Sequence, residues 1–145
     1  MKYEEIHRNL FTMDKKYVLV QAISLDCEMG KGIAVEFDKK FKGMKSYLKN
    51  EIKKNSLKFP ITILYKGKQD VFNLITKRIY NGKPTYNTIG QCIKQMADIC
   101  IQENIKYLAM PKIGCGLDRL QWGEVREIIQ SYFKDIDIEI IVCKK

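Results

Sequence analysis

Histidine is nearly absent from this sequence of 145 residues, which contains a single one, His7. A Ser-His-Asp or Cys-His mechanism would have to use that residue, and a metal site with two histidines cannot form. Any enzyme chemistry must therefore rest on other side chains. The candidates for proton transfer or nucleophilic attack are carboxylates, lysines, cysteines and serines.

The sequence also lacks a Cys-x-x-Cys pair, because its five cysteines are well separated and their number is odd. This pattern argues against a disulfide framework and against a cysteine zinc site. We therefore expect reduced thiols at positions 27, 92, 100, 115 and 143.

A long apolar run is missing as well. No uninterrupted apolar segment approaches the roughly 20 residues that span a bilayer, and the first residues lack the basic-then-apolar order of a secretory signal. We therefore expect a cytoplasmic protein with no membrane association. The length favours one domain, residues 1–145, and the 46% of hydrophobic residues is enough to build its core.

Acidic residues are in the minority: 26 lysines and arginines against 17 aspartates and glutamates give a net charge of +9. Such a charge attracts phosphates, nucleic acid or acidic protein surfaces. The excess is concentrated in residues 38–58, where eight lysines accompany two acidic residues, a net charge of +6. This segment is either a solvated helix face or a patch that contacts a polyanion.

Short bursts of β-forming residues alternate with segments of helical periodicity. The strand candidates are Tyr3–His7, Tyr17–Ile23, Phe59–Tyr65, Asp70–Thr76, Tyr107–Met110 and Glu139–Cys143. Helical spacing covers residues 86–100 and 125–133 and, less regularly, 33–48, with a break near Gly43. The connection around Gly67 indicates a hairpin. We therefore predict an α/β fold with a mixed central sheet covered by helices on both faces.

Two glycine-bearing turns, residues 26–32 and 114–118, each follow a strand candidate and precede a helix candidate. Glycines let the backbone approach a ligand closely, and the helix N-terminus that follows favours negative charge. Either turn alone is weak evidence of a ligand site. Two turns in equivalent positions, at the edge where open α/β sheets bind ligands, favour a site for a diphosphate.

Lys77 and Asp118 are candidates for chemistry near these turns. Lys77 ends the strand candidate that reads Leu-Ile-Thr-Lys, and Asp118 follows the second glycine turn. Withdrawal from water disfavours the charged form of a lysine, and a neutral amine is a nucleophile. The residues alone leave two structural alternatives open, an exposed strand-end lysine and an aspartate in the first turn of a helix.

The segment Ile113–Trp122, Ile-Gly-Cys-Gly-Leu-Asp-Arg-Leu-Gln-Trp, closely resembles a signature of macrodomains, in the subclass called terminal ADP-ribose protein glycohydrolase. Further blocks within Ile23–Val35, Leu74–Lys77 and Lys83–Tyr86 resemble the same subclass in the same order. The similarity runs from about residue 10 to about residue 142. It implies a three-layer α/β/α macrodomain fold with an ADP-ribose cleft above the strand ends.

The resemblance further implies an ADP-ribosyl hydrolase that releases ADP-ribose from acyl linkages, on protein Glu or Asp or on acylated ADP-ribose, without a metal or cofactor. In this subclass the lysine matching Lys77 is the proposed nucleophile toward C1″ of the distal ribose, and the aspartate matching Asp118 acts as acid/base. The serine matching Ser24 is implicated in substrate binding. The other candidate binding residues are Asn9, Leu10, Gly30, Gly32, Ile33, Thr76, Gly114, Cys115, Gly116 and Leu117.

One departure from the family pattern concerns adenine. This sequence has Arg8-Asn9-Leu10 where the family usually has Gly-Asp-Leu, so Asn9 would contact the adenine amino group without a charge. Two other functions stay open: a hydrolase that removes ADP-ribose from a nucleobase in DNA, and a non-catalytic ADP-ribose-binding module. The expected partners are ADP-ribose or ADP-ribosylated protein and, for the first alternative, ADP-ribosylated DNA. We expect a monomer.

Overall fold

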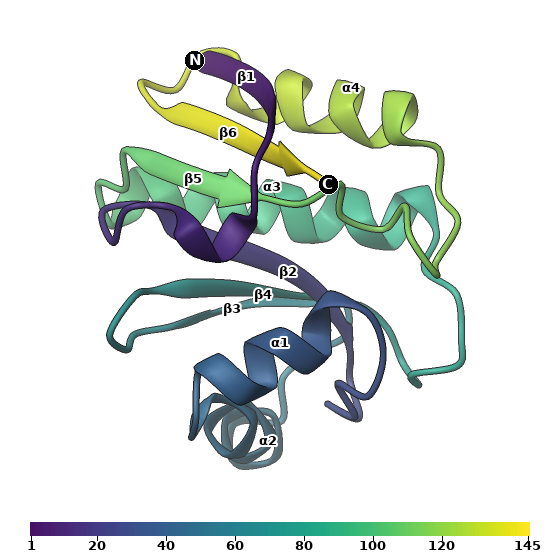
Figure 1. Ribbon diagram of the computed structural model, residues 1–145. Helices are drawn as coiled ribbons and strands as arrows, with labels where there is room; N and C mark the ends of the chain where they lie inside the picture. Colours follow the sequence, from purple (N-terminus) through teal and green to yellow (C-terminus); the bar gives the residue numbers. More distant parts are fainter.

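One mixed sheet of six strands forms the centre of the protein in the computed structural model, which describes residues 1–145 (Figure 1). The strands are β1 (Lys2–His7), β2 (Val18–Ser24), β3 (Ile61–Tyr65), β4 (Val71–Lys77), β5 (Tyr107–Met110) and β6 (Glu139–Lys144). Their order is β1-β6-β5-β2-β4-β3, and every neighbouring pair is parallel except β3 with β4. The predicted hairpin and the mixed sheet are confirmed.

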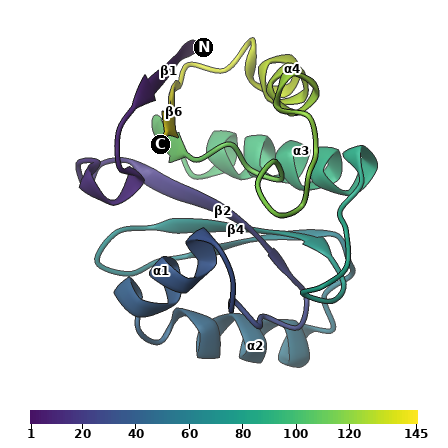
Figure 2. The same cartoon turned by 45° about the vertical axis from the view of Figure 1, so that its right-hand side comes forward.

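Helices cover both faces of the sheet (Figures 1 and 2). One layer contains α1 (Ile33–Lys40) and α2 (Met44–Asn55), and the other contains α3 (Tyr86–Gln102) and α4 (Trp122–Phe133). Gly43 separates α1 from α2 with a φ of 93°, as the break in the sequence pattern indicated. A short 3₁₀ helix, η1 (Leu10–Thr12), was not predicted. None of the helices combines the length and the apolar character needed to cross a bilayer.

The alternation of side chains along the central strands builds two cores. Val18 and Val20 of β2 pack with α3 and α4, whereas Leu19 and Ile23 pack with α1 and α2. β4 alternates in the same way. Because both faces of the sheet are covered, β2 and β4 are mostly apolar. The buried polar residues at their centres, Gln21 and Asn73, are paired by a hydrogen bond from Gln21 Nε2 to Asn73 Oδ1 at 2.8 Å. Burial fixes the two strands firmly, and their carboxyl ends therefore hold the side chains of the site on a rigid support.

Glu5 joins the edge strand β1 to α4. Its Oε2 atom accepts hydrogen bonds from Tyr3 Oη at 2.6 Å, Trp122 Nε1 at 3.0 Å and Arg126 Nη1 at 3.2 Å. Burial by itself would raise the pKa of Glu5, but these hydrogen bonds outweigh it and lower the pKa to about 2. The ionised carboxylate therefore stabilises the contact between β1 and α4.

We expect Glu5→Gln to lower the free energy of unfolding by about 2 kcal/mol near neutral pH, because it replaces charge-assisted hydrogen bonds with weaker ones. The folded-state pKa lies below the ordinary value of 4.5, so the contribution is complete above that value and is lost as the pH falls toward 2. Urea unfolding of both proteins at about pH 7, 5 and 3 measures this. The difference should shrink at the lowest pH, and a constant difference would contradict the prediction.

Candidate active site

A cleft of about 620 Å³ opens at the carboxyl edge of the sheet. Ser24 at the end of β2, Lys77 at the end of β4 and Pro111 just after β5 all line it. The parallel arrangement of these strands brings their carboxyl ends to one edge, where open α/β sheets bind ligands. The topology thus collects side chains that are far apart in the sequence.

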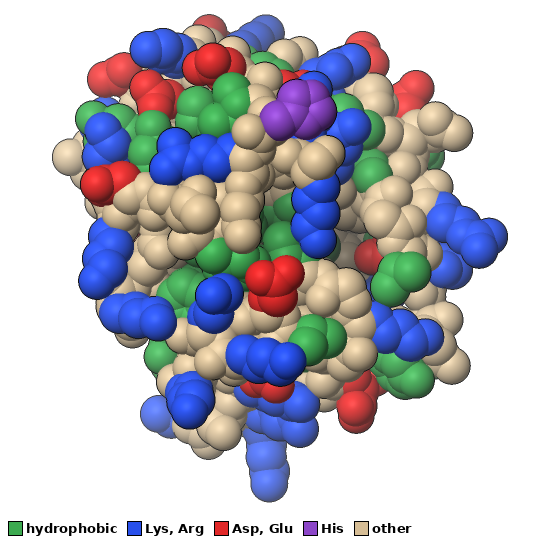
Figure 3. All heavy atoms as spheres, viewed as in Figure 1, with side chains coloured by type: hydrophobic (Ala, Val, Ile, Leu, Met, Phe, Trp, Pro, Cys, Tyr) green, Lys and Arg blue, Asp and Glu red, His purple; other side chains and the backbone are tan.

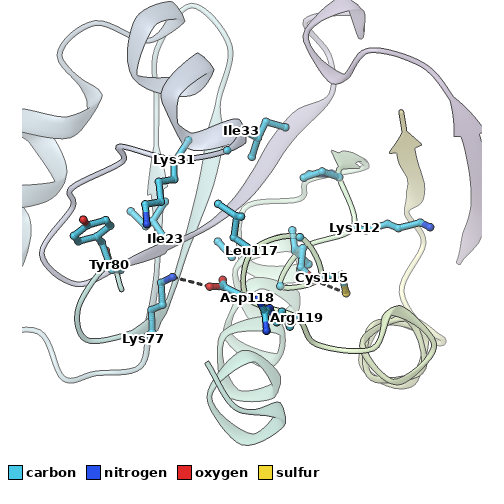
Figure 4. Close-up of a pocket in the computed structure, with 18 of the residues that line it drawn as sticks. Ile23, Lys31, Ile33, Lys77, Tyr80, Lys112, Cys115, Leu117, Asp118 and Arg119 are labelled. Atoms are coloured by element: carbon cyan, nitrogen blue, oxygen red, sulfur yellow. Dashed lines mark hydrogen bonds and ion pairs between the residues drawn. The ribbon is translucent and has the colours of Figure 1, made fainter. Parts of the chain in front are cut away.

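The two glycine turns face each other across this cleft (Figure 4). Leu117 Cδ1 lies 3.8 Å from the position that a Cβ atom on Gly32 would occupy. Gly32 also precedes α1, and no side chain caps the N-terminus of that helix. Ile33 and Ala34, the first residues of α1, line the cleft. Their backbone N–H groups have no partner within the helix, and they make this wall suitable for an anion.

The glycines of the two turns serve different purposes. Gly32 and Gly114 have φ values of 59° and 76°, a region that other residues rarely adopt. A Cβ atom on Gly114 would also lie 2.9 Å from Ile89 Cδ1, too close for two carbon atoms. Gly30 and Gly116, in contrast, have no heavy atom within 4 Å of such a Cβ. Both line the cleft, so the open space beside them allows a ligand to approach the backbone.

The cleft is strongly cationic. Seven lysine and arginine residues line it, whereas Asp118 contributes the one side-chain carboxylate among the lining residues. The cations are Lys31, Lys77, Lys83, Lys112, Arg119, Lys144 and Lys145. This excess of positive charge attracts an anionic ligand such as a diphosphate.

Lys77 and Asp118 meet inside the cleft, although they are 41 residues apart in the sequence. Lys77 Nζ donates a hydrogen bond to Asp118 Oδ1 at 2.6 Å, and the two side chains are 13% and 14% exposed (Figure 4). Lys77 extends from the end of β4, and Asp118 extends from the loop 114–118. A partly buried amine beside a proton acceptor is the arrangement that nucleophilic catalysis requires.

A second carboxylate, Asp26, supports the site from the β2–α1 loop. Ser24 Oγ donates to Asp26 Oδ1, and the backbone N–H of Tyr80 donates to Asp26 Oδ2 at 3.0 Å. Burial acts to raise the pKa of Asp26, but the hydrogen bonds outweigh it and the pKa is lowered. Because the hydroxyl proton of Ser24 is committed to Asp26, Ser24 presents lone pairs to the cleft and can accept a hydrogen bond from a ligand.

Most of the remaining predicted site residues line the cleft, and three lie elsewhere. The three are Asn9, Leu10 and Thr76. Asn9 and Leu10 line an adjoining cavity of about 420 Å³, where Asn9 Oδ1 also caps η1 by accepting a hydrogen bond from Phe11 N at 3.0 Å. Thr76 is 1% exposed, because the alternation along β4 places its side chain on the face that packs with α3.

Several lining residues had no role in the sequence analysis. Tyr80 and Lys112 carry no local signal that distinguishes them from other surface residues. Lys83 belongs to a block that resembles the macrodomain subclass, so its position could have been suspected. No group of three histidine, cysteine, aspartate or glutamate side chains converges in the protein, so the residues present offer no such metal site.

The fold and the site define the class of three-layer α/β proteins that hold a ligand cleft at the carboxyl edge of the sheet. The family model described as Macro domain matches residues 20–129 of this chain. The chain is also 41% identical to the ADP-ribose glycohydrolase OARD1 of Bos taurus over 134 residues, which cover 92% of this chain and 86% of the relative. The chain therefore belongs to the Macro domain family.

Solved structures agree with this assignment at the level of the fold. The macrodomain of Mycobacterium tuberculosis DarG matches with a TM-score of 0.88 at 20% identity, over 97% of this chain and 96% of that one. Thermosipho africanus DarTG in complex with ADP-ribose matches with a TM-score of 0.82 at 23% identity, over 94% of this chain and 39% of that one. The macrodomain fold that the resemblance implied is confirmed.

Proposed function

We propose that this protein is an ADP-ribosyl hydrolase that releases ADP-ribose from acyl linkages, on glutamate or aspartate side chains of proteins or on acylated ADP-ribose. The contact between Lys77 and Asp118 inside the cleft carries this proposal. A module that only binds ADP-ribose needs the glycine turns, but it does not need an amine and a carboxylate in contact. The name of the Bos taurus relative, ADP-ribose glycohydrolase, supports the same activity.

The cleft would bind the ligand through its diphosphate. The free N–H groups at the start of α1 and the open backbone beside Gly30 and Gly116 donate to phosphate oxygens. The surrounding lysine and arginine side chains add attraction for the negative charge. With the diphosphate held there, the distal ribose extends toward the Lys77 end of the cleft.

The chemistry proceeds in two steps. Asp118 accepts a proton from the Lys77 ammonium, and the neutral amine attacks C1″ of the distal ribose. A bond forms between Nζ and C1″ while the bond between C1″ and the acyl oxygen breaks, so the carboxylate leaves. Water then attacks C1″ and the C–N bond breaks. Asp118 returns its proton to Lys77. The attacking water keeps its hydroxyl group on C1″ and releases its remaining proton to solvent, and free ADP-ribose leaves the site.

The number of carboxylates in the cleft favours an acyl linkage. A departing glutamate or aspartate side chain is a stable anion, because its conjugate acid has a pKa of about 4. A departing serine oxygen would need a proton from a general acid. Asp118 is the one side-chain carboxylate that lines the cleft, and the proton that it takes from Lys77 returns to that lysine in the second step. The site is therefore suited to a leaving group that needs no protonation.

We expect release of free ADP-ribose from a peptide modified on glutamate to be at least about a hundredfold faster than release from the same peptide modified on serine, which is the size of a general-acid contribution. Chromatography of the free ADP-ribose measures both rates. Calorimetric titration with ADP-ribose is the companion measurement. Tight binding without release from either peptide would contradict the proposal and identify a binding module.

A second candidate substrate is ADP-ribose linked to a nucleobase in DNA. The lysine-rich surface of residues 38–58 favours it, because Lys45 Nζ donates to the backbone oxygen of Glu28 at 3.0 Å and thereby places α2 beside the loop that leads into the cleft. Figure 3 shows lysine and arginine side chains gathered over α1 and α2. Release from modified single-stranded DNA should then exceed release from modified protein and should fall steeply with added salt.

A further inference from the structure

The end of β4 and the segment that leads from it to α3 form hydrogen bonds with two adjacent residues of the loop 114–118, Leu117 and Asp118. Lys77, the last residue of β4, donates from Nζ to Asp118 Oδ1 at 2.6 Å. Lys83, near the end of the segment, donates from Nζ to the backbone oxygen of Leu117 at 2.9 Å. Beyond the loop, the backbone N–H of Gln121 donates to Tyr86 Oη at 3.0 Å and fixes the start of α4 against α3. The segment and the loop thus form one connected unit.

The middle of the loop has little other support. Its base is closed by backbone hydrogen bonds from Leu120 N to Gly114 O at 2.8 Å and from Arg119 N to Gly116 O at 3.2 Å. Leu117, at the tip, is 61% exposed and contributes little packing. The side-chain hydrogen bond to the backbone of residues 115–118 comes from Lys83 alone.

This hydrogen bond controls the residue that follows. The peptide unit between Leu117 and Asp118 is planar and trans, so fixing the direction of the Leu117 carbonyl also fixes the N–H of Asp118 and the direction in which its Cα leaves. Lys83 therefore constrains where the Asp118 carboxylate lies. We propose that Lys83 is a positioning residue that keeps Asp118 at the reaction centre after Lys77 has left it.

This inference rests on the proposed function and concerns its second step. In the free protein Lys77 itself holds Asp118 in place. Once Lys77 Nζ is bonded to C1″ and its proton is on Asp118, the ion pair that joined the two side chains is gone, and Asp118 must still be present to exchange protons while water breaks the C–N bond. The hydrogen bond from Lys83 does not depend on Lys77, so it preserves the position of Asp118 throughout the cycle.

The test compares Lys83→Met, which removes the hydrogen bond, with Lys83→Arg, which can still donate to the Leu117 carbonyl. Lys94→Met is the matched control, because Lys94 lies on α3 outside the cleft, is 58% exposed and pairs only with Asp98. We expect Lys83→Met to lower kcat about ten- to hundredfold, as misplacement of a catalytic group does. Because Lys83 is one of the seven cations that line the cleft, the Kd for ADP-ribose should rise as well, but by less than kcat falls, and Lys83→Arg should recover most of kcat.

The distinguishing readout is the covalent intermediate. The amine-linked ribose opens to an imine, which cyanoborohydride reduces to a stable adduct. During turnover by Lys83→Met, the fraction of protein that carries this adduct on Lys77, measured by mass spectrometry, should rise above that of the unaltered protein. Lys94→Met should show neither effect. A higher KM or Kd with unchanged kcat would overturn the proposal and show that Lys83 only attracts the anion. A fall in kcat without a rise in trapped intermediate would overturn it as well.

A measurement without substrate separates this inference from the proposed function. Hydrogen exchange of the amides of residues 114–120 in the free protein should be faster in Lys83→Met than in Lys83→Arg or Lys94→Met. Unchanged exchange contradicts the positioning role whatever the activity of the protein. Absence of ADP-ribose release by the unaltered protein contradicts the proposed function, even when exchange shows that Lys83 holds the loop.

Discussion

Lys77→Arg is expected to reduce the release of ADP-ribose about a thousandfold or more, which is typical of the loss of a nucleophile. Arginine remains protonated at all relevant pH values and cannot attack C1″. It keeps the positive charge, however, and can still pair with Asp118, whose carboxylate lies 2.6 Å from the lysine nitrogen. The variant therefore isolates nucleophilicity from electrostatics. Steady-state release from a glutamate-modified peptide measures the effect.

Binding provides the control for this variant. The Kd of Lys77→Arg for ADP-ribose, measured by calorimetric titration, should stay within about fivefold of the original, because the charge in the cleft is unchanged. Lys94→Arg makes the same chemical change on the exposed surface and should have no effect. If Lys77→Arg released ADP-ribose at the original rate, Lys77 would not be the nucleophile and the proposed mechanism would be wrong.

Gly114→Ala is expected to destabilise the protein by about 2–5 kcal/mol. A residue with a Cβ atom loses about 1–2 kcal/mol in the left-handed region, and Gly114 has a φ of 76°. The new Cβ would lie 2.9 Å from Ile89 Cδ1 and 3.1 Å from Leu120 Cδ1, which adds the cost of overpacking, about 1–3 kcal/mol. Urea unfolding with linear extrapolation gives the free energy of unfolding.

Gly116→Ala is the matched control for that prediction. It makes the same substitution two residues further along the same loop, where a Cβ atom meets no heavy atom within 4 Å. Its free energy of unfolding should change by less than about 1 kcal/mol. Equal losses in the two variants would mean that loop flexibility, and not the strained backbone and crowding at Gly114, decides the result.

Most of the fold could be predicted because its signals are local. Tyr107–Met110 was predicted with the bounds that β5 has, and Asp70–Thr76 differs from β4 by one residue at each end. Alternation and helical periodicity are properties of neighbouring residues, so they can be found without any contact map. The helix η1 (Leu10–Thr12) was missed, because three residues are too few for a periodic pattern and the Asn9 cap creates the turn.

The site was less accessible from the residues alone. Lys77 and Asp118 were candidates from their positions, but each also had an ordinary structural explanation, and only the resemblance to macrodomains favoured a catalytic role over it. Nothing in the local sequence indicated that Asp26 would hold Ser24 and the Tyr80 backbone, or that Lys83 would bind the Leu117 carbonyl. These contacts join segments that are adjacent only after the strands have taken their order in the sheet.

The sequence by itself determined the α/β class, the two glycine turns and the excess of positive charge, because composition and periodicity act over a few residues. The tertiary structure alone decided that Lys77 Nζ lies 2.6 Å from Asp118. That distance depends on the order β5-β2-β4, in which parallel pairing brings the carboxyl ends of the strands to one edge. Strand order is fixed by how all helices and strands bury their apolar faces together, and no short segment contains that information.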